Sequence, residues 1–383
     1  METLIPYQVN ILCSKRKASM LKYILLFCFI FLCSVNSSVF AETKSDLPSE
    51  SLPSLVSAIR IAEPLNFCGE PVPLDRAEVR EKLEKELLLM LWNRPQIILW
   101  LKRSSRYFPY IEKTLRQHNM PADLKFIPVI ESSMLSHAGS PKGALGYWQF
   151  IEETGRKYDL IIDRNIDERR NFFTATNAAV AYLQDLYDLF GSWTLAATAY
   201  NLGEDRLQAE KTSQQVDSYY ELFLPIETQR YIFRIIAAKL ILSNPSRYGF
   251  YLNPEDYYQP VTFDRVKISL PSITPLYLVA QASGTYFKQI KDLNPQIRGH
   301  DLLTGTYILA VPEGSGANFH SRFGVLAEKW RQENKMHIYI VKKGDTLSTV
   351  AERFKVNLPS LMAWNDLTQD KYIYPGEKLV IYQ

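Results

Sequence analysis

Residues 121–150 read PADLKFIPVIESSMLSHAGSPKGALGYWQF, and this stretch decides the fold. An apolar run closes at Glu131, and the end of the stretch is rich in glycine and aromatic residues. From Pro121 to about Leu242, apolar residues recur at helical spacing, with Gly and Pro as interruptions and without strand alternation. We therefore expect an all-α domain.

The sequence on both sides of this stretch extends the helical domain. Apolar positions three or four residues apart predict helices, the first of them capped by Asp75. These helices are expected at 75–92, 96–102, 107–117, 176–190, 193–200 and 228–242. The preceding residues, 42–74, are rich in Pro and Ser, which predicts a linker or loose arm.

After Pro245 the pattern changes to short β-branched runs, at 266–268, 307–309, 339–341 and 379–381. When the tail is shifted by 71 residues (365 − 294 = 71), Asn365 falls on Asn294 and Gly376 on Gly305. This self-similarity predicts two copies of a small strand–helix–helix–strand α+β module, at 264–312 and 337–383. The first copy lacks the Gly344-Asp345 turn of the second.

The N-terminus has the pattern of a secretory signal peptide. Basic residues precede an apolar run over 23–35, which is shorter than the roughly 20 residues that a membrane span needs. Small residues at Val39 and Ala41 predict cleavage after Ala41, so we expect a signal peptide over 1–41. Lipid attachment at Cys33 is possible but not favoured, because Leu32 precedes it. The mature chain would keep only Cys68, which excludes an internal disulfide.

The amino-acid composition disfavours some classes of function. A net charge of +3 argues against a generally basic nucleic-acid-binding protein. The five His are scattered, with no spacing that predicts a metal site, and we expect no cofactor. Aromatic residues make up 13%, which suits large cores or a sugar-stacking cleft.

Glu131 is the candidate for chemistry. A carboxyl group beside an apolar helix face would be partly desolvated, which raises its pKa toward the range that a general acid needs near neutral pH. An ordinary surface Glu is the alternative reading. Downstream lie Gly146, Tyr147 and Gln149, followed by Tyr200-Asn201. Glycine permits close approach to a ligand and Gln offers both a donor and an acceptor.

Taken together, these motifs resemble the soluble lytic transglycosylase family, whose catalytic domain is lysozyme-like. The resemblance covers roughly residues 75–250, and the stretch 93–113 resembles the arm preceding that domain in membrane-bound members. It implies that Glu131 is the single catalytic acid and base, and that sugar sites are lined by Ser132, Gly146, Tyr147, Gln149, Tyr200 and Asn201. This sequence departs from the family pattern at Ile127, Tyr147 and Leu202, which puts individual subsite contacts in doubt.

The tail from Tyr339 to Ile381 resembles a LysM peptidoglycan-binding module. The resemblance implies a groove for N-acetylglucosamine built from Gly344, Asp345, Thr346, Leu347 and Asn365. The first copy would be a degenerate LysM, which we expect to pack or space rather than bind.

These observations predict an exported enzyme that cleaves peptidoglycan between N-acetylmuramic acid and N-acetylglucosamine and leaves 1,6-anhydromuramic ends. The alternatives are a goose-type-lysozyme-like hydrolase, with Glu152, Glu153, Glu204 or Glu227 as second carboxylate, and a non-catalytic cell-wall-binding protein. We expect a periplasmic monomer with glycan strands as partner and without nucleic acid. Membrane anchoring or association with the outer membrane is possible.

Overall fold

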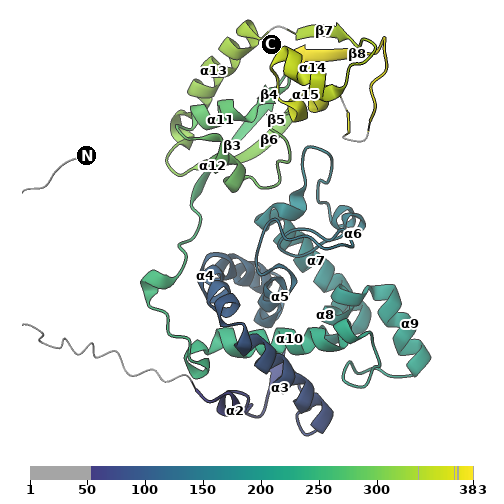
Figure 1. The fold of residues 1–383 in the computed structure, drawn as a ribbon. Helices are drawn as coiled ribbons and strands as arrows, with labels where there is room; N and C mark the ends of the chain where they lie inside the picture. The colour runs from purple at the N-terminus through teal and green to yellow at the C-terminus, as the bar shows by residue number, and fades with distance from the viewer. Residues whose placement is uncertain (1–52, 335, 366, 369–370, 383) are drawn as a thin grey trace, which may run out of the picture. The chain divides into compact units, whose positions relative to one another are not determined.

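The computed structural model describes residues 53–334, 336–365, 367–368 and 371–382 (Figure 1). The expected signal peptide lies outside these residues. The hydrophobic core falls into three clusters, within 58–250, 266–330 and 341–381. No helix in the described part of the chain has both the length and the hydropathy to cross a bilayer.

The first cluster is the core of a helical domain, which agrees with the expected mainly α fold class. Its α-helices are α2 (Leu55–Ala58), α3 (Ala77–Trp92), α4 (Arg94–Gln117), α5 (Ile127–Ser132), α6 (Glu152–Lys157), α7 (Phe172–Phe190), α8 (Trp193–Leu202), α9 (Glu204–Gln214) and α10 (Ile226–Ser243). Short 3-10 turns η1 (Ala122–Phe126), η2 (Glu168–Arg170), η3 (Pro245–Tyr248) and η4 (Pro254–Asp256) connect or follow them.

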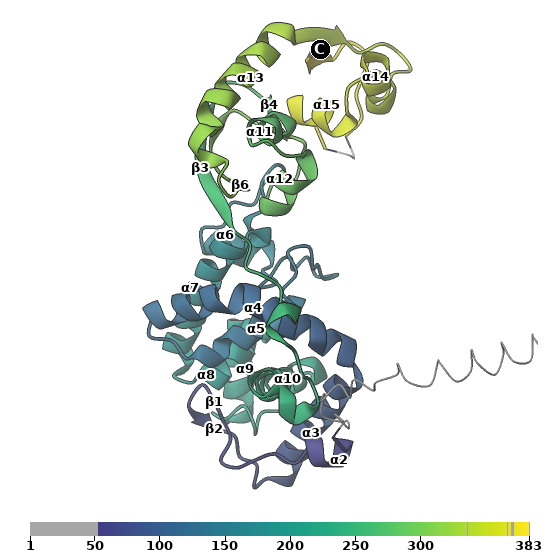
Figure 2. The same ribbon diagram turned by 90° about the vertical axis from the view of Figure 1, so that its left-hand side faces the viewer.

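Helix α10 is the centre of this domain. It packs against α3, α8, α5 and η1, and Figure 2 shows it nearly end-on among the other helices. Ile232, Ile235 and Ile236 are fully buried, because apolar residues cover several faces of the helix rather than one stripe. Because α10 lies beside α5, side chains from the last α-helix of the domain reach Glu131.

The helix boundaries differ from expectation at two places. The segments 96–102 and 107–117 form one helix, α4, with Pro109 inside it. The hydroxyl groups of Ser104 and Ser105 donate to carbonyl groups one turn earlier, so they do not interrupt the helix. Asp75 is not the cap of α3, because Arg76 occupies that position without a side-chain hydrogen bond.

The expectation of a loose arm is wrong for residues 53–74. A hairpin of β1 (Asn66–Phe67) and β2 (Glu70–Pro71) buries Phe67 completely. Glu70 accepts hydrogen bonds from the Thr194 backbone N–H at 3.0 Å and from the Ser192 hydroxyl at 2.9 Å. A carboxylate at the N-terminus of α8 is favourable for the helix dipole. The arm is thus part of the domain.

The tail contains the two expected modules. The first has β3 (Phe263–Leu270), β4 (Thr274–Pro275), α11 (Leu276–Ala282), α12 (Phe287–Leu293), β5 (Asp301–Leu302) and β6 (Gly305–Pro312). The second has β7 (Met336–Ile340), α14 (Leu347–Phe354), α15 (Leu358–Trp364) and β8 (Lys378–Tyr382). Strands β3 and β6 pair antiparallel with Val266 opposite Leu309, and β7 pairs with β8 with Ile338 opposite Val380.

The internal repeat is confirmed by two equivalent asparagines. The Asn294 amide donates to the carbonyl groups of Ile290 and Ala310 and accepts from the Ala310 N–H. The Asn365 amide makes the same set of bonds with Leu361 and Val380. In each module this side chain joins the end of the second helix to the last strand.

One element of the tail was not expected. A 3-10 turn, η5 (Gly316–Asn318), leads into helix α13 (Phe319–Glu333) between the modules. The helix packs on α11 and buries Phe319, Phe323 and Trp330 in the core of the first module. The first module is therefore larger than the repeat itself.

Candidate active site

Glu131 lies one residue before the end of α5, on a helix whose other side chains are almost all buried. Ile127 and Val129 are fully buried, and Ile130 nearly so. The helix ends at Ser133 and Met134, two non-glycine residues with positive φ of 54° and 58°. Such left-handed residues are uncommon and cluster at functional sites. Glu131 itself has intermediate exposure at the end of this apolar helix.

The surroundings of Glu131 determine its charge state. Burial raises the pKa of Glu131 to about 7, while a hydrogen bond from Tyr231 and the charge of Arg234 act in the opposite direction. The Tyr231 hydroxyl donates to Oε1 at 2.6 Å. Tyr231 and Arg234 both come from α10, and so does Glu227, whose charge raises the pKa further. A carboxyl group with a pKa near 7 can both give and take a proton at neutral pH.

Tyr200 and Asn201 lie at the end of α8. The Tyr200 hydroxyl donates to the Trp148 carbonyl at 2.7 Å. Burial and the charge of Glu131 both raise the pKa of Tyr200. Asn201 accepts a hydrogen bond from the buried Thr228 at 3.0 Å. The sequence-predicted residues Glu131, Tyr200 and Asn201 therefore gather around the start of α10.

Ser132 connects α5 to the segment 143–150. Its hydroxyl lies 2.6 Å from the Tyr147 carbonyl and 3.1 Å from that of Pro128. Gln149, with a φ of 51°, donates from its amide to the carbonyl groups of Ala138 and Gly146, both at 2.8 Å. These polar groups hold the backbone beside the acid, and contact with sugar stays a prediction for both.

Gly146 has a steric reason to be glycine. Its φ is 82°, and a Cβ atom there would lie 1.9 Å from the Arg169 carbonyl oxygen. Arg169 pairs with the buried Asp167 at 2.7 Å and donates to the carbonyl groups of Gly143 and Phe150. Burial opposes the charge of Asp167, but the hydrogen bonds from Arg169 hold the pKa of Asp167 below its ordinary value. This ion pair fixes both ends of the segment 143–150.

The aromatic pair in this segment lies in the core. Trp148 is fully buried and donates from its indole to Thr176 at 3.0 Å. A ring buried in the core cannot stack on a ligand, so Trp148 is a core residue. Tyr147 is 7% exposed, and its ring packs against Tyr107 and Phe172. Its position agrees better with support of the segment than with direct stacking on a sugar.

Three of the four candidate second carboxylates have no effect on the pKa of Glu131. Glu152 pairs with Arg156 at 2.8 Å, Glu204 accepts from Tyr182 at 2.7 Å, and Glu153 is exposed. Of the four candidate carboxylates, only Glu227 shifts the pKa of Glu131 through its charge. Within the described residues, no three His, Cys, Asp or Glu side chains form a group able to hold a metal ion.

In the second module, most of the predicted glycan-binding residues stabilise the turn at Gly344-Asp345. The Asp345 carboxylate accepts from the Tyr339 hydroxyl at 2.6 Å, the Lys342 N–H at 2.8 Å and Arg353 at 2.8 Å. These bonds lower the pKa of Asp345 to about 2. Thr346 caps α14, and Gly344 supplies a φ of 91°.

Leu347 packs on the module core, and the Asn365 amide is used within the fold as described above. The side chains of Asp345 and Asn365 thus stabilise the module, and their contact with glycan stays a prediction.

The sequence analysis assigns no role to Tyr231. A tyrosine at helical spacing from other apolar residues looks like a core residue, and Tyr231 is indeed buried. Its position 100 residues from Glu131 leaves no local signal of the contact.

Comparisons with known proteins agree with this geometry. The family model described as "Transglycosylase SLT domain" matches residues 108–223, and that described as "LysM domain" matches residues 339–381. The chain is 33% identical over 331 residues to membrane-bound lytic murein transglycosylase D of Escherichia coli strain K12, with 82% of this chain and 72% of the relative covered.

Solved structures show more distant likeness. The inactive mutant of lytic transglycosylase Slt from Pseudomonas aeruginosa is 18% identical with a TM-score of 0.29, over 40% of this chain and 26% of that one. The 70-kDa soluble lytic transglycosylase of Escherichia coli is 16% identical with a TM-score of 0.33, over 49% of this chain and 34% of that one.

Proposed function

This chain belongs to the family of membrane-bound lytic murein transglycosylase D, and from that membership we propose which residues carry out its reaction. The protein is a peptidoglycan lytic transglycosylase, and the hydrolase and non-catalytic alternatives are not favoured. The single observation that supports the residue assignment is the carboxyl group of Glu131, with its pKa raised to about 7, inside the matched domain.

Glu131 acts first as an acid. Its proton goes to the glycosidic oxygen between N-acetylmuramic acid and N-acetylglucosamine, and the C1–O bond of the muramoyl residue breaks. The substrate's acetamido group assists the oxocarbenium-like state. Because the carboxyl group is about half protonated near pH 7, a substantial fraction of the enzyme is ready for this step.

Glu131 then acts as a base. The carboxylate takes the proton of the muramoyl C6 hydroxyl, whose oxygen bonds to C1 and closes the 1,6-anhydro ring. The acid is restored and no water is consumed. Tyr231 positions the carboxylate through its hydrogen bond, while Tyr200 and Asn201 line the sugar sites. Ser132, Gly146, Tyr147 and Gln149 shape the backbone beside them.

Binding and location complete the proposal. The second module binds peptidoglycan through the turn at Gly344, Asp345, Thr346 and Leu347 and the loop after Asn365. Its substrate places the enzyme in the cell envelope. Export by a signal peptide over 1–41, a periplasmic location and a monomeric state are parts of the proposal, without a membrane anchor.

The test is digestion of murein sacculi followed by mass spectrometry of the released muropeptides. We expect 1,6-anhydromuramic ends, which borohydride does not reduce. Glu131→Gln keeps the side-chain volume but cannot shuttle a proton, so turnover should fall by at least about 10²–10⁴. Glu152→Gln, a change at an exposed ion-paired carboxylate, is the matched control. Products one water heavier, or solubilisation by Glu131→Gln at a rate close to the parent, would contradict the assignment.

A further inference from the structure

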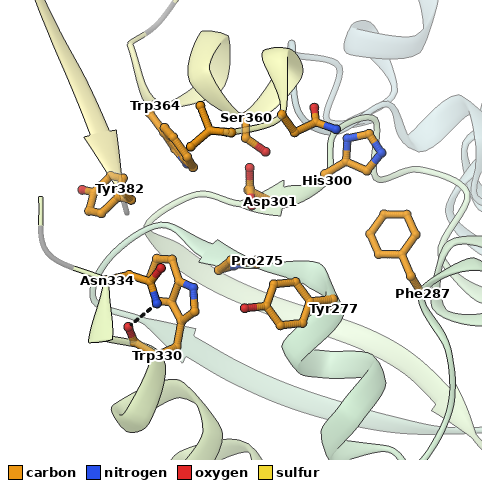
Figure 3. A pocket seen from close by; sticks show the side chains of 12 residues that line it. Pro275, Tyr277, Phe287, His300, Asp301, Trp330, Asn334, Ser360, Trp364 and Tyr382 are labelled. Atoms are coloured by element: carbon orange, nitrogen blue, oxygen red, sulfur yellow. Dashed lines mark hydrogen bonds between the residues drawn. The ribbon is translucent and has the colours of Figure 1, made fainter. Parts of the chain in front are cut away.

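A pocket of about 450 Å³ lies between the first module and the second (Figure 3). Tyr277 of α11 and Asp301 of β5 line it from the first module, together with Trp330 of α13. Ser360 and Trp364 line it from α15 of the second module. This volume falls in the range of small-ligand sites, about 300–1,000 Å³.

Aromatic side chains form one wall of the pocket. Tyr382, from the last strand, lies between two tryptophans, with ring centroids 6.1 Å from Trp330 and 5.4 Å from Trp364. Tyr277 lies on another side and is 41% exposed. Rings from both modules therefore present apolar surface to one space.

Two buried polar atoms at the pocket have no partner among the described residues. Asp301 is only 5% exposed, and its Oδ2 accepts no hydrogen bond. The indole Nε1 of Trp364 is also buried and donates to nothing. In Figure 3 the Asp301 carboxyl group points toward Ser360. Burial raises the pKa of Asp301, and a hydrogen bond from Ser360 acts in the opposite direction, so Oδ2 is the carboxyl atom left open. A buried acceptor and a buried donor left open on one cavity are costly unless something in the cavity meets them.

We propose that this pocket binds a sugar ring of the glycan chain, at a site distinct from the catalytic cleft and from the turn at Gly344. The proposal rests on the proposed function, since it takes the glycan as the substrate. None of the five residues assigned to the glycan groove of the second module lines this pocket.

The chemistry of a pyranose ring matches what the pocket offers. One face of the ring carries C–H groups that stack on aromatic side chains, as Tyr277, Trp330 and Trp364 would allow. Its hydroxyl groups donate to a carboxylate such as Asp301, in a charge-assisted hydrogen bond. A hydroxyl or acetamido oxygen accepts from the Trp364 indole.

The site also gives the first module a role. Its lost Gly-Asp turn argues against a groove of its own, yet it supplies Tyr277 and Asp301 to the lining of this pocket. The two modules would then bind glycan as a pair. Binding of the strand at one module raises its effective concentration at the other.

The experiment uses the full-length Glu131→Gln protein, so that no probe is cleaved, labelled with 5-fluorotryptophan. Fluorine NMR reports each of the six tryptophans separately, and Trp330→Phe and Trp364→Phe assign the two signals of the pocket. The probe is the β-1,4-linked tetramer of N-acetylglucosamine. We expect both signals to shift saturably. Tyr277→Ala should weaken this response about tenfold, and Asp301→Asn several-fold, because stacking and the charged acceptor are lost.

Tyr286→Ala is the matched control, since Tyr286 is 64% exposed in the same module and does not line the pocket. It should leave the response unchanged. Unmoved signals at millimolar tetramer, an equal response in Tyr277→Ala, or a response to a short lysine peptide but not to the tetramer would overturn the sugar site. Cleavage by the otherwise native enzyme carrying Tyr277→Ala, measured on short soluble glycans, should match the parent. Failure of the pocket and failure of the Glu131 assignment are thus separable.

Discussion

The role proposed for Glu131 depends on opposing influences on its pKa that come from different parts of the chain. Its own helix supplies burial, which raises the pKa, while Tyr231 and Arg234 of α10 lower it. The balance leaves a carboxyl group with a pKa of about 7, where acid and base forms are both populated. A change at α10 should therefore alter the pH dependence of the reaction without touching the acid.

Tyr231→Phe removes the hydrogen bond that lowers the pKa of Glu131. The acid should then stay protonated to higher pH, so the alkaline limb of the pH–rate profile should move upward, with a reduced maximal rate. Tyr220→Phe is the matched control, because the Tyr220 hydroxyl is buried and has no hydrogen-bond partner in the part of the chain that the structure describes. An unchanged alkaline limb in Tyr231→Phe would show that this hydrogen bond does not tune the acid.

The raised pKa of Glu131 also predicts a pH-dependent stability difference. The unfolded carboxyl has a pKa near 4.3, so between pH 4.3 and about 7 the folded state binds more protons than the unfolded state. Stability from this group is therefore lost as the pH rises through that window. Glu131→Gln should be close to the parent at pH 4 and more stable by about 3–4 kcal/mol at pH 8. Thermal unfolding of both proteins across this range measures it, and a pH-independent difference would contradict the raised pKa.

At the scale of elements, the site depends on how the segment 143–150 is held against α5. Ser132 binds its backbone from one side, and the Arg169–Asp167 pair binds both of its ends. Gly146 permits the close approach of this backbone to that of Arg169. The position of this segment therefore affects the position of Glu131 at the end of α5.

Gly146→Ala should be far more damaging than Gly143→Ala. Both residues have positive φ, so each substitution incurs about 1–2 kcal/mol of backbone strain. At Gly146 the new Cβ also meets the Arg169 carbonyl at 1.9 Å, whereas at Gly143 it meets nothing within 4 Å. We expect a loss of stability of about 3 kcal/mol or more and a strong loss of activity for Gly146→Ala alone. Equal melting temperatures for the two variants would contradict this account.

At the scale of the whole molecule, catalysis and attachment use separate hydrophobic cores. Glu131 belongs to the helical core, whereas the LysM match falls on the third cluster. A module with its own core contributes to turnover on a polymer by keeping the enzyme near it rather than by shaping the transition state.

Deleting residues 337–383 should weaken binding to insoluble sacculi and leave cleavage of short soluble glycans nearly intact. Asp345→Ala should reproduce part of the loss, because it removes the acceptor that joins Tyr339, Lys342 and Arg353. Asp292→Ala, at an exposed ion pair of the first module, is the control. Equal sacculus binding by the full-length and truncated proteins in a pull-down assay would assign attachment to another part of the chain.

Local pattern predicted the helical domain and the repeated module, whereas Glu131 became the candidate acid through the family resemblance, because its own segment alone favours an ordinary surface Glu. Helical spacing and the apolar run ending at Glu131 are properties of neighbouring residues, and the shift that aligns Asn294 with Asn365 is visible in the letters alone. Tertiary structure decided the rest. Tyr231 meets Glu131, Glu70 meets α8, and the modules share a pocket through contacts between residues distant in sequence. Such contacts depend on how whole helices and strands pack, and no spacing within a single element encodes them.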